Sequence, residues 1–458
     1  MSSLNASLAT ALSGLTAEQG ALEATTNNVA NVNTPGYSRL VPVLVSSDPI
    51  VVDPLTLGTG VTLQSVESIR DPLLESQIQQ ETQVQGQFNS LTSALQQTQD
   101  NFTTSSSDIG TQISNFFDSI NQLSTDPADL SVRQGVLTAA GNLATSFNTT
   151  ANSLTQQQNS LDLSVVQTVG QINQLTSQIA QLNGQISNLQ NVGESAGSFI
   201  DQRTQAIDQL STLTDISVIP SNNSVTLTTG NGAALVTGQQ SFTLQTQLNS
   251  SGLHDVYSQG DDITASITSG QLGGTLQARD QQIPAILTQL DTLASSLANA
   301  VNGVQAAGFD LNGNAGTNLF TPPPATGVGA AASLSVAITD PSLIAASSDG
   351  STGSNGNAEA LYALGSQTII NGQTPSDYYS GVVFNVGNDV SNASAEQTAS
   401  GLVLQQLNDQ RSSISGVSLD EEAANMVQYQ SAYAAAAQVV TTINDMLYTV
   451  VNMATLTG

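Results

Sequence analysis

The sequence lacks cysteine, lysine and tryptophan, and it contains a single histidine, His254. The missing cysteines exclude disulfide bridges, thiolate metal sites and cysteine nucleophiles. Without lysine, the chain cannot form a glycine-rich phosphate loop that uses a lysine. A lone histidine excludes a metal site with several histidine ligands, and its flanking Gly252 and Asp255 favour a surface or loop position. We therefore expect no catalytic residue, no cofactor and no metal, and we expect that the protein is not an enzyme.

Positive charge is also scarce. The chain has 458 residues, of which six are Arg and 35 are Asp or Glu, so the formal net charge is −29. Such a balance excludes nucleic acid and anionic membrane surfaces as partners. No run of 18 apolar residues is present, which predicts no membrane insertion. The first 38 residues contain no basic residue, so we expect export from the cytoplasm, if it occurs, without a cleaved signal peptide.

Both ends of the chain carry apolar residues at alternating steps of four and three, a spacing that places them along one side of a helix. A stripe of this kind must pack against another surface, and the other terminus or a neighbouring subunit is the simplest partner. Glu18 and Thr25 are polar members of the first stripe, and Gln430 and Asn444 of the second. This predicted assembly seam consists of Leu4, Leu8, Ala11, Leu15, Leu22 and Val29 near the start, and of Leu419, Met426, Tyr433, Val440, Leu447 and Val451 near the end.

The pattern between the two stripes predicts a mainly α protein with a β-rich insertion, whose helical body is discontinuous in sequence. The expected domains are a terminal coiled-coil assembly domain (1–33 and 419–458), a helical body (34–214, 278–305 and 374–418), a small β-rich insert (215–277) and a loop-rich outer insert (306–373). Within the body, Pro42, Pro49 and Pro54 predict an extended segment with little regular sheet at 40–70. Asp126-Pro127 is expected to open a helix, and the longest apolar stripe covers 161–189.

Two acidic motifs have simple structural interpretations. The run from Asp310 to Gly316 resembles part of a calcium loop, but its glycine is misplaced and Thr321 stands where a glutamate ligand is needed, which favours an Asn-Gly turn. The triplet Asp420-Glu421-Glu422 suits the first turn of a helix, where the dipole favours negative charge.

Residues 27–39 resemble the N-terminal signature of the bacterial flagellar axial family, which comprises rod, hook and hook-associated proteins. The segments 201–218, 274–280, 308–313, 377–379 and 415–425 resemble further parts of the junction proteins of this family, in the same order. The residues that carry the N-terminal signature are Ala30, Asn31, Asn33, Thr34, Pro35, Gly36 and Tyr37.

The resemblance implies a structural protein that polymerises by its terminal helices at the hook–filament junction and joins hook to filament. Its implied partners are further copies of itself in a ring or helical oligomer, the hook protein, a second junction protein and an export chaperone at the C-terminal helix. It would reach the extracellular flagellum by the flagellar type III route. The alternatives are another axial protein, of the hook or distal rod, and an acidic secreted enzyme or adhesin. The short segment at 306–373 predicts that a large outer domain is reduced.

Overall fold

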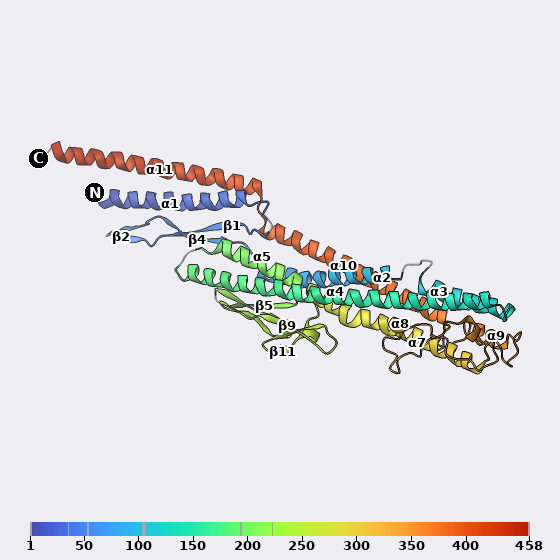
Figure 1. Cartoon of the computed structure of the whole chain (residues 1–458). Coiled ribbons are helices and arrows are strands. Elements are labelled where there is room, and N and C mark those ends of the chain that lie inside the picture. Colours follow the sequence, from blue (N-terminus) through green and yellow to red (C-terminus); the bar gives the residue numbers. More distant parts are fainter. Residues whose placement is uncertain are drawn as a thin grey trace. The chain divides into compact units, whose positions relative to one another are not determined.

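The computed structural model describes residues 2–34, 36–52, 55–102, 107–192, 195–221 and 223–456. Figure 1 shows a mainly helical chain with a β-rich insertion, and long helices at both ends, as the sequence predicted. The chain divides into two compact units, whose boundaries fall inside three long helices and at the start of one strand. Unit 1 comprises Met1–Gln83, Gln171–Leu244 and Ser400–Gly458, and unit 2 comprises Val84–Gly170 and Gln245–Ala399. The domain boundaries given above remain predictions.

The helices follow the predicted periodicity closely. The second helix ends at Asp100 and the third begins at Ile109, while residues 103–106 lie outside the described part of the chain; a break at Gly416 separates the last two helices. The helices are α1 (Ser2–Ala30), α2 (Pro72–Asp100), α3 (Ile109–Thr125), α4 (Leu130–Asn191), α5 (Gly197–Leu213), α6 (Gly270–Gln277), α7 (Ile283–Ala307), α8 (Ala330–Ser333), α9 (Gly356–Ala363), α10 (Pro375–Ser415) and α11 (Leu419–Leu456).

The start of α4 differs from the prediction. Asp126-Pro127 does not open the helix, because Asp129 caps it instead: its carboxylate accepts from the N–H of Ser131 at 2.6 Å and of Val132 at 3.3 Å. From Leu130 the helix continues unbroken for 62 residues, and so includes the whole stripe at 161–189.

The expectation of little regular sheet at 40–70 is wrong. Strands β1 (Leu40–Ser46) and β4 (Val61–Ser68) form an antiparallel ladder from Leu40↔Ser68 to Ser46↔Val61, with a bulge between Val43 and Leu44. Between them lie β2 (Ile50–Val52) and β3 (Leu55–Leu57), which pair with each other. Pro42 fits because a two-stranded ladder leaves one side of each strand unpaired, so its missing N–H breaks no bond on that side.

The predicted insert at 215–277 contains two sheets rather than one, and it ends in helix. One sheet has the order β5-β6-β7-β8 and the other β11-β10-β9. After them come a 3₁₀ turn, α6, and a π-helical turn at Ala278–Gln282 that continues into α7. The strands are β5 (Ile216–Ser221), β6 (Ser224–Thr229), β7 (Ala234–Thr237), β8 (Gln240–Ser241), β9 (Leu244–Leu248), β10 (His254–Ser258) and β11 (Asp261–Asp262).

Unit 2 has a continuous hydrophobic core. Its members come from α3, the first half of α4, α7, α9, the start of α10 and the segment between α7 and α9, and they include the fully buried Phe116, Phe147 and Phe320. The loop at 310–316 lies over this unit as the predicted turn: one carboxylate oxygen of Asp310 accepts from the N–H groups of Asn312 and Asn314, each at 2.8 Å.

In unit 1, buried amide side chains attach a sheet to the helices. Asn183 on α4 donates to the oxygens of Val225 (2.9 Å) and Gly238 (2.8 Å) and accepts from the N–H of Val225 at 3.2 Å. Gln83 on α2 donates to the oxygen of Ile216 at 3.0 Å. These bonds satisfy both backbone and amide groups, which would be costly to bury unpaired.

Candidate functional site: the terminal helix pair

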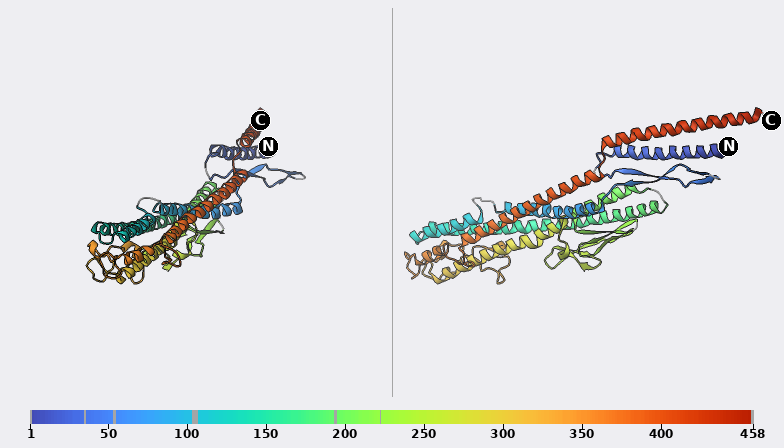
Figure 2. Two further views of the ribbon diagram at one scale, coloured as in Figure 1. Left: turned by 90° about the vertical axis from the view of Figure 1, so that its right-hand side faces the viewer. Right: turned by 180° about the vertical axis from the view of Figure 1, so that it is seen from behind.

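Helices α1 and α11 lie side by side and run antiparallel, with the two termini at the same end of the pair (Figures 1 and 2). The opposite end of the pair is formed by residues 27–39, which we call the signature segment, and by the first turn of α11. Helix α1 also packs against β1 and β4. The β-facing side is close-packed, since a Cβ on Gly20 would come within 2.4 Å of Leu63 Cδ2.

On α1, the predicted seam residues lie beside the fully buried residues of the helix and are not fully buried themselves. The six residues Leu4, Leu8, Ala11, Leu15, Leu22 and Val29 are all half-buried, none fully. The fully buried positions on this helix are small or polar: Ala17, Ala21, Ala24, Thr25 and Asn28. The apolar stripe is therefore only partly covered within one subunit.

On α11, the six residues of the predicted seam differ in their exposure to solvent. Met426, Val440 and Leu447 are half-buried, whereas Leu419, Tyr433 and Val451 are exposed. A neighbouring column at seven-residue spacing contains the buried Glu422 and Ile443, with the half-buried Tyr429 and Ala436 between them. Among residues 419–453, only Glu422 and Ile443 are fully buried.

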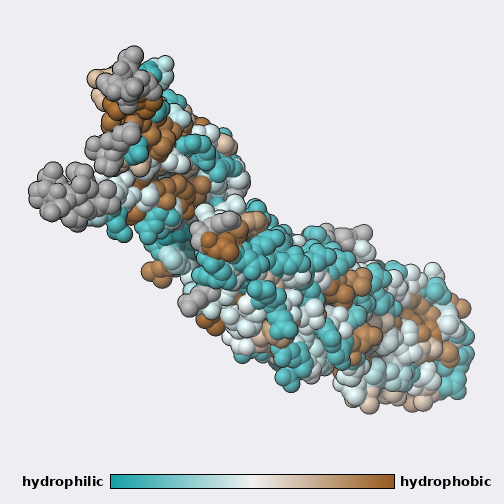
Figure 3. All heavy atoms as spheres, turned by 90° about the vertical axis from the view of Figure 1, so that its left-hand side faces the viewer, coloured by the Kyte–Doolittle hydropathy of each residue, from teal (hydrophilic) through white to brown (hydrophobic). Residues whose placement is uncertain are grey.

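The rest of α11 presents apolar side chains to solvent. Figure 3 shows several groups of hydrophobic residues on the surface, among them one on the terminal helices. The exposed large hydrophobic residues of α11 are Leu419, Val427, Tyr433, Val439, Met446, Tyr448, Val450, Val451 and Met453. A patch of this extent on a soluble protein is typical of an interaction surface.

The signature segment forms a tight turn after α1. The N–H of Tyr37 donates to the oxygen of Thr34 at 3.2 Å, and Gly36 has φ +78°, which an L-residue rarely adopts. Asn31 donates to the side chain of Asn27 at 2.8 Å and accepts from Thr34 at 3.2 Å. Ala30 is exposed and Asn33 is exposed, while Pro35 lies outside the described residues. Gly36 thus supplies the backbone conformation that this turn requires.

Two residues at this end of the pair, Asn28 and Arg39, were not singled out from the sequence. Asn28 is buried and accepts from the hydroxyl of Tyr37 at 2.9 Å. Burial, followed by the charges of nearby acids, raises the pKa of Tyr37 to about 12, which keeps this hydroxyl a donor. Arg39 donates to Glu422 at 2.8 Å and so connects the signature segment to α11. In the sequence, the signals for this contact were the acid Glu422 among the apolar residues of α11 and Arg39 directly after the turn.

One carboxylate oxygen of the α1 stripe has no hydrogen bond to any residue that the structure describes. Glu18 occupies a heptad position, and its Oε2 is buried without a hydrogen bond. Burial raises the pKa of Glu18. Burial also raises the pKa of Tyr429 on α11, and the negative charges of Glu18 and then Glu422 raise it further. An unpaired carboxylate at a helix–helix contact weakens that contact.

All six arginines are engaged within their own subunit. Arg39 pairs with Glu421 and Glu422, Arg70 with Asp201, Arg279 with Asp162 and Asp280, and Arg411 lies 3.6 Å from both Glu75 and Asp208. Arg203 donates to Asn183 at 2.9 Å, and Arg133 to the backbone oxygens of Pro127 (2.7 Å) and Ile344 (2.6 Å). None is left over for an ion pair with another copy.

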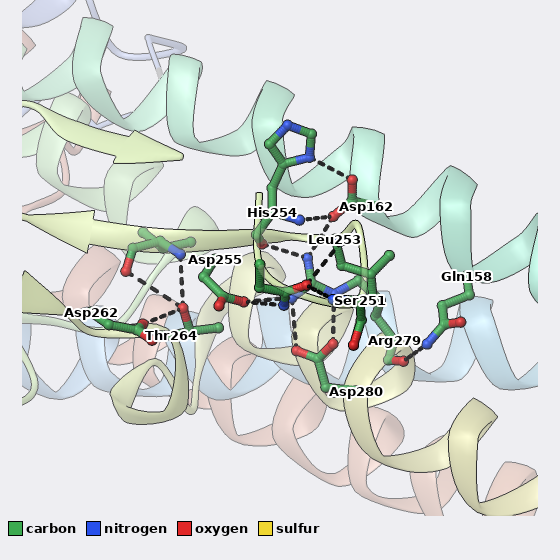
Figure 4. Close-up of polar contacts among 12 residues, drawn as sticks. Gln158, Asp162, Ser251, Leu253, His254, Asp255, Asp262, Thr264, Arg279 and Asp280 are labelled. Carbon is green, nitrogen blue, oxygen red and sulfur yellow. Dashed lines mark hydrogen bonds and ion pairs between the residues drawn. The ribbon is translucent and has the colours of Figure 1, made fainter. Parts of the chain in front are cut away.

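The remaining polar cluster is the one in unit 2 around His254 (Figure 4). Asp162 accepts from the N–H of His254 at 2.7 Å, contacts its Nδ1 at 2.6 Å, and accepts from Arg279 at 2.8 Å. Burial opposes the charge of Asp162, but these bonds and charges lower its pKa overall. The histidine lies on β10 and is half-buried, so it is not the loop residue that the sequence suggested. The cluster fastens a strand to α4 and the π turn.

Neither a metal site nor a membrane span is found in the described part of the chain. No group of three or more His, Asp or Glu side chains there is placed to hold a metal ion. No described helix is both long enough and apolar enough to cross a membrane.

Comparison with known proteins defines the class. Residues 8–37 match the family model of the flagella basal body rod protein, and residues 409–453 match that of the flagellar basal body rod FlgEFG protein C-terminal. These two segments are the ones that form the terminal helix pair, so the class is that of flagellar axial proteins. Residues 95–320 match the flagellar hook-associated protein FlgK helical domain.

Curated relatives give the family. Flagellar hook-associated protein 1 of Bacillus subtilis is 31% identical over 99% of both chains. The proteins of the same name from Escherichia coli and Salmonella typhimurium are 28% and 27% identical, each over 97% of this chain. The chain belongs to the family of flagellar hook-associated protein 1.

The fold agrees with this assignment. The solved structure of the flagellar hook junction protein FlgK from Burkholderia pseudomallei is similar with a TM-score of 0.69 and 19% sequence identity. The match covers 74% of this chain and all of that one.

Proposed function

We propose that this protein polymerises through its terminal helices at the hook–filament junction and so joins hook to filament. The observation that carries this proposal is the half-covered apolar surface of the α1–α11 pair. A single subunit leaves Leu419, Tyr433 and Val451 exposed and buries the α1 stripe only partly. Contact between copies would remove this surface from water, which is the main favourable contribution in association.

The charges of the subunit support apolar rather than ionic contacts between copies. The chain carries 35 acids, and each of its six arginines already has a partner in its own subunit. Forming an ion pair between subunits would first break an internal ion pair or hydrogen bond of the arginine, and the gain from an exposed pair is small. The terminal stripes are thus the better source of attraction.

The finer assignments follow from the family resemblance and are part of the same proposal. The partners are further copies of this chain, the hook protein, a second junction protein, and an export chaperone that covers the C-terminal helix before export. The location is the extracellular flagellum, reached without a cleaved signal peptide. No catalytic role is proposed, since the relatives are named only as flagellar hook-associated proteins.

Mass spectrometry of purified flagella tests the location. Whole flagella and flagella stripped of filament are compared with isolated hooks from a strain that lacks this protein. The proposal expects the protein in the first two preparations, at far fewer copies than hook protein or filament protein, and hooks of normal length in the deletion strain. A hook or distal rod protein would instead be required for the hook itself, and loss of hooks in the deletion strain would overturn the proposal.

A further inference from the structure

The connection between α10 and α11 is short and has its own geometry. Helix α10 ends at Ser415 and α11 begins at Leu419, so residues 416–418 form a three-residue hinge. The N–H of Gly416 donates to the oxygen of Ser412 at 3.0 Å. A Cβ at Gly416 would lie 2.2 Å from that oxygen, so the turn out of α10 requires glycine.

One residue holds both sides of this hinge. The N–H of Arg39 donates to the oxygen of Ser415 at 3.0 Å, at the end of α10. Its side chain donates from Nε to Glu422 at 2.8 Å and from the second terminal nitrogen to Glu421 at 2.6 Å, in the first turn of α11. Arg39 therefore fixes the last residue before the hinge and the first turn after it.

The two acidic partners differ in burial. The side chain of Glu422 is 1% exposed and that of Arg39 is 17% exposed, whereas Glu421 is 53% exposed. An exposed ion pair contributes little, but a buried carboxylate that loses its only cation is strongly unfavourable. Position 422 can therefore stay buried only while Arg39 is in place.

Arg39 is itself anchored to the first helix. Its backbone oxygen accepts from the N–H of Ile69 at 2.9 Å, and the next residue, Leu40, is bonded in both directions to Asn28 of α1, at 2.8 Å each. The signature segment thus connects α1 to the start of α11, through the bonds of Asn28 to Leu40 and of Arg39 to Glu422.

We propose that Arg39 is the positioning residue that sets the direction in which α11 leaves α10, and so the register of α11 on α1. Without the bond between Arg39 and Glu422, the hinge at 416–418 is free to turn and the terminal pair loses a defined register. The consequence for assembly rests on the function proposed above, but the direction of α11 does not.

The chain offers a direct measurement, because it has no cysteine. Cysteines introduced by Gln406→Cys on α10 and Gln430→Cys on α11, both exposed positions, carry spin labels on the two sides of the hinge. Double electron–electron resonance of the full chain should give one narrow distance distribution. Arg39→Gln should broaden it at least twofold. Glu421→Gln is the matched control, since it removes only the exposed pair, and it should leave the distribution narrow.

A charge exchange separates positioning from general destabilisation. Arg39→Glu alone should broaden the distribution, and Arg39→Glu combined with Glu422→Arg should narrow it again. An unchanged distribution in Arg39→Gln, with a normal helical circular dichroism spectrum, overturns the proposal, as does failure of the exchange to restore it in a folded chain. If Arg39→Gln broadens the distribution and cells still attach filaments normally, the positioning role stands and the function proposed for the pair is contradicted.

Discussion

Asn28 of α1 and Leu40 of β1 are bonded in both directions. The amide nitrogen of Asn28 donates to the oxygen of Leu40 at 2.8 Å, and its Oδ1 accepts from the N–H of Leu40 at 2.8 Å. The same Oδ1 also accepts from Tyr37. One buried side chain thus closes the turn between the first helix and the first strand.

Asn28→Asp should destabilise this turn. The new carboxylate oxygen faces the oxygen of Leu40 instead of donating to it, and a buried polar group without its bond costs about 1–3 kcal/mol, more when charged. Amide hydrogen exchange of α1 and β1 in the full chain should accelerate by about tenfold or more. Asn27→Asp, an exposed change that keeps the acceptor used by Asn31, is the control and should have little effect. Equal effects of the two substitutions would contradict this role.

Glu18 should make the terminal pair pH-dependent. Because burial raises its folded-state pKa, the folded state binds the proton more tightly than the unfolded state, and stability falls as pH rises from the unfolded pKa through the folded one. Glu18→Gln should therefore stabilise the pair at pH 7. The gain should shrink as the pH is lowered and wild-type Glu18 becomes protonated as well.

Hydrogen exchange of α1 and α11 at several pH values measures this gain. Glu23→Gln on the same helix removes the same charge at an exposed position and should show no such pH-dependent gain. If the Glu18 variant is no more stable than wild type at pH 7, its carboxylate has a partner in solution and the interpretation is wrong.

Self-association of the purified protein should increase with salt. A net charge of −29 makes copies repel, and the arginines are all engaged internally, so screening weakens the repulsion more than any attraction. Between about 10 mM and 150 mM salt the Debye length falls from about 30 to 8 Å. Sedimentation velocity at these two concentrations should show larger species at the higher one. Smaller species at higher salt would mean that ion pairs between subunits control the contact.

The sequence predicted the helices and strands that depend on residues close together in the chain. It missed those that depend on contacts between residues far apart in the chain. The helix that carries the stripe at 161–189 and the β-rich insert follow from apolar patterns, which act over a few residues. The β1–β4 ladder was missed because Pro42 usually argues against a strand, and the sequence alone does not show that its other edge is unpaired. Asp129 replaced Asp126 as the cap of α4 for a similar reason, since both are acids close to the start of the helix.

The candidate site shows the same limit. The apolar spacing located the stripes on both terminal helices, but two columns of α11 have acceptable seven-residue spacing. One column contains the fully buried Glu422 and Ile443, whereas the column of Tyr433 contains only half-buried and exposed residues, and this difference depends on how α1 lies against α11. Arg39 and Glu422 are separated by 383 residues, and no local pattern relates two residues so far apart.

The most direct test of assembly through the terminal pair is electron microscopy of cells that carry Leu447→Asp or Leu15→Asp. Either change places a carboxylate in the half-buried stripe, where an unpaired charge costs several kcal/mol in an assembled contact. Leu248→Asp, at an exposed position outside the pair, is the matched control. We expect both seam variants to be produced and folded in cells whose hooks bear no filaments, and the control to bear normal filaments. Normal filaments in both seam variants would contradict the account.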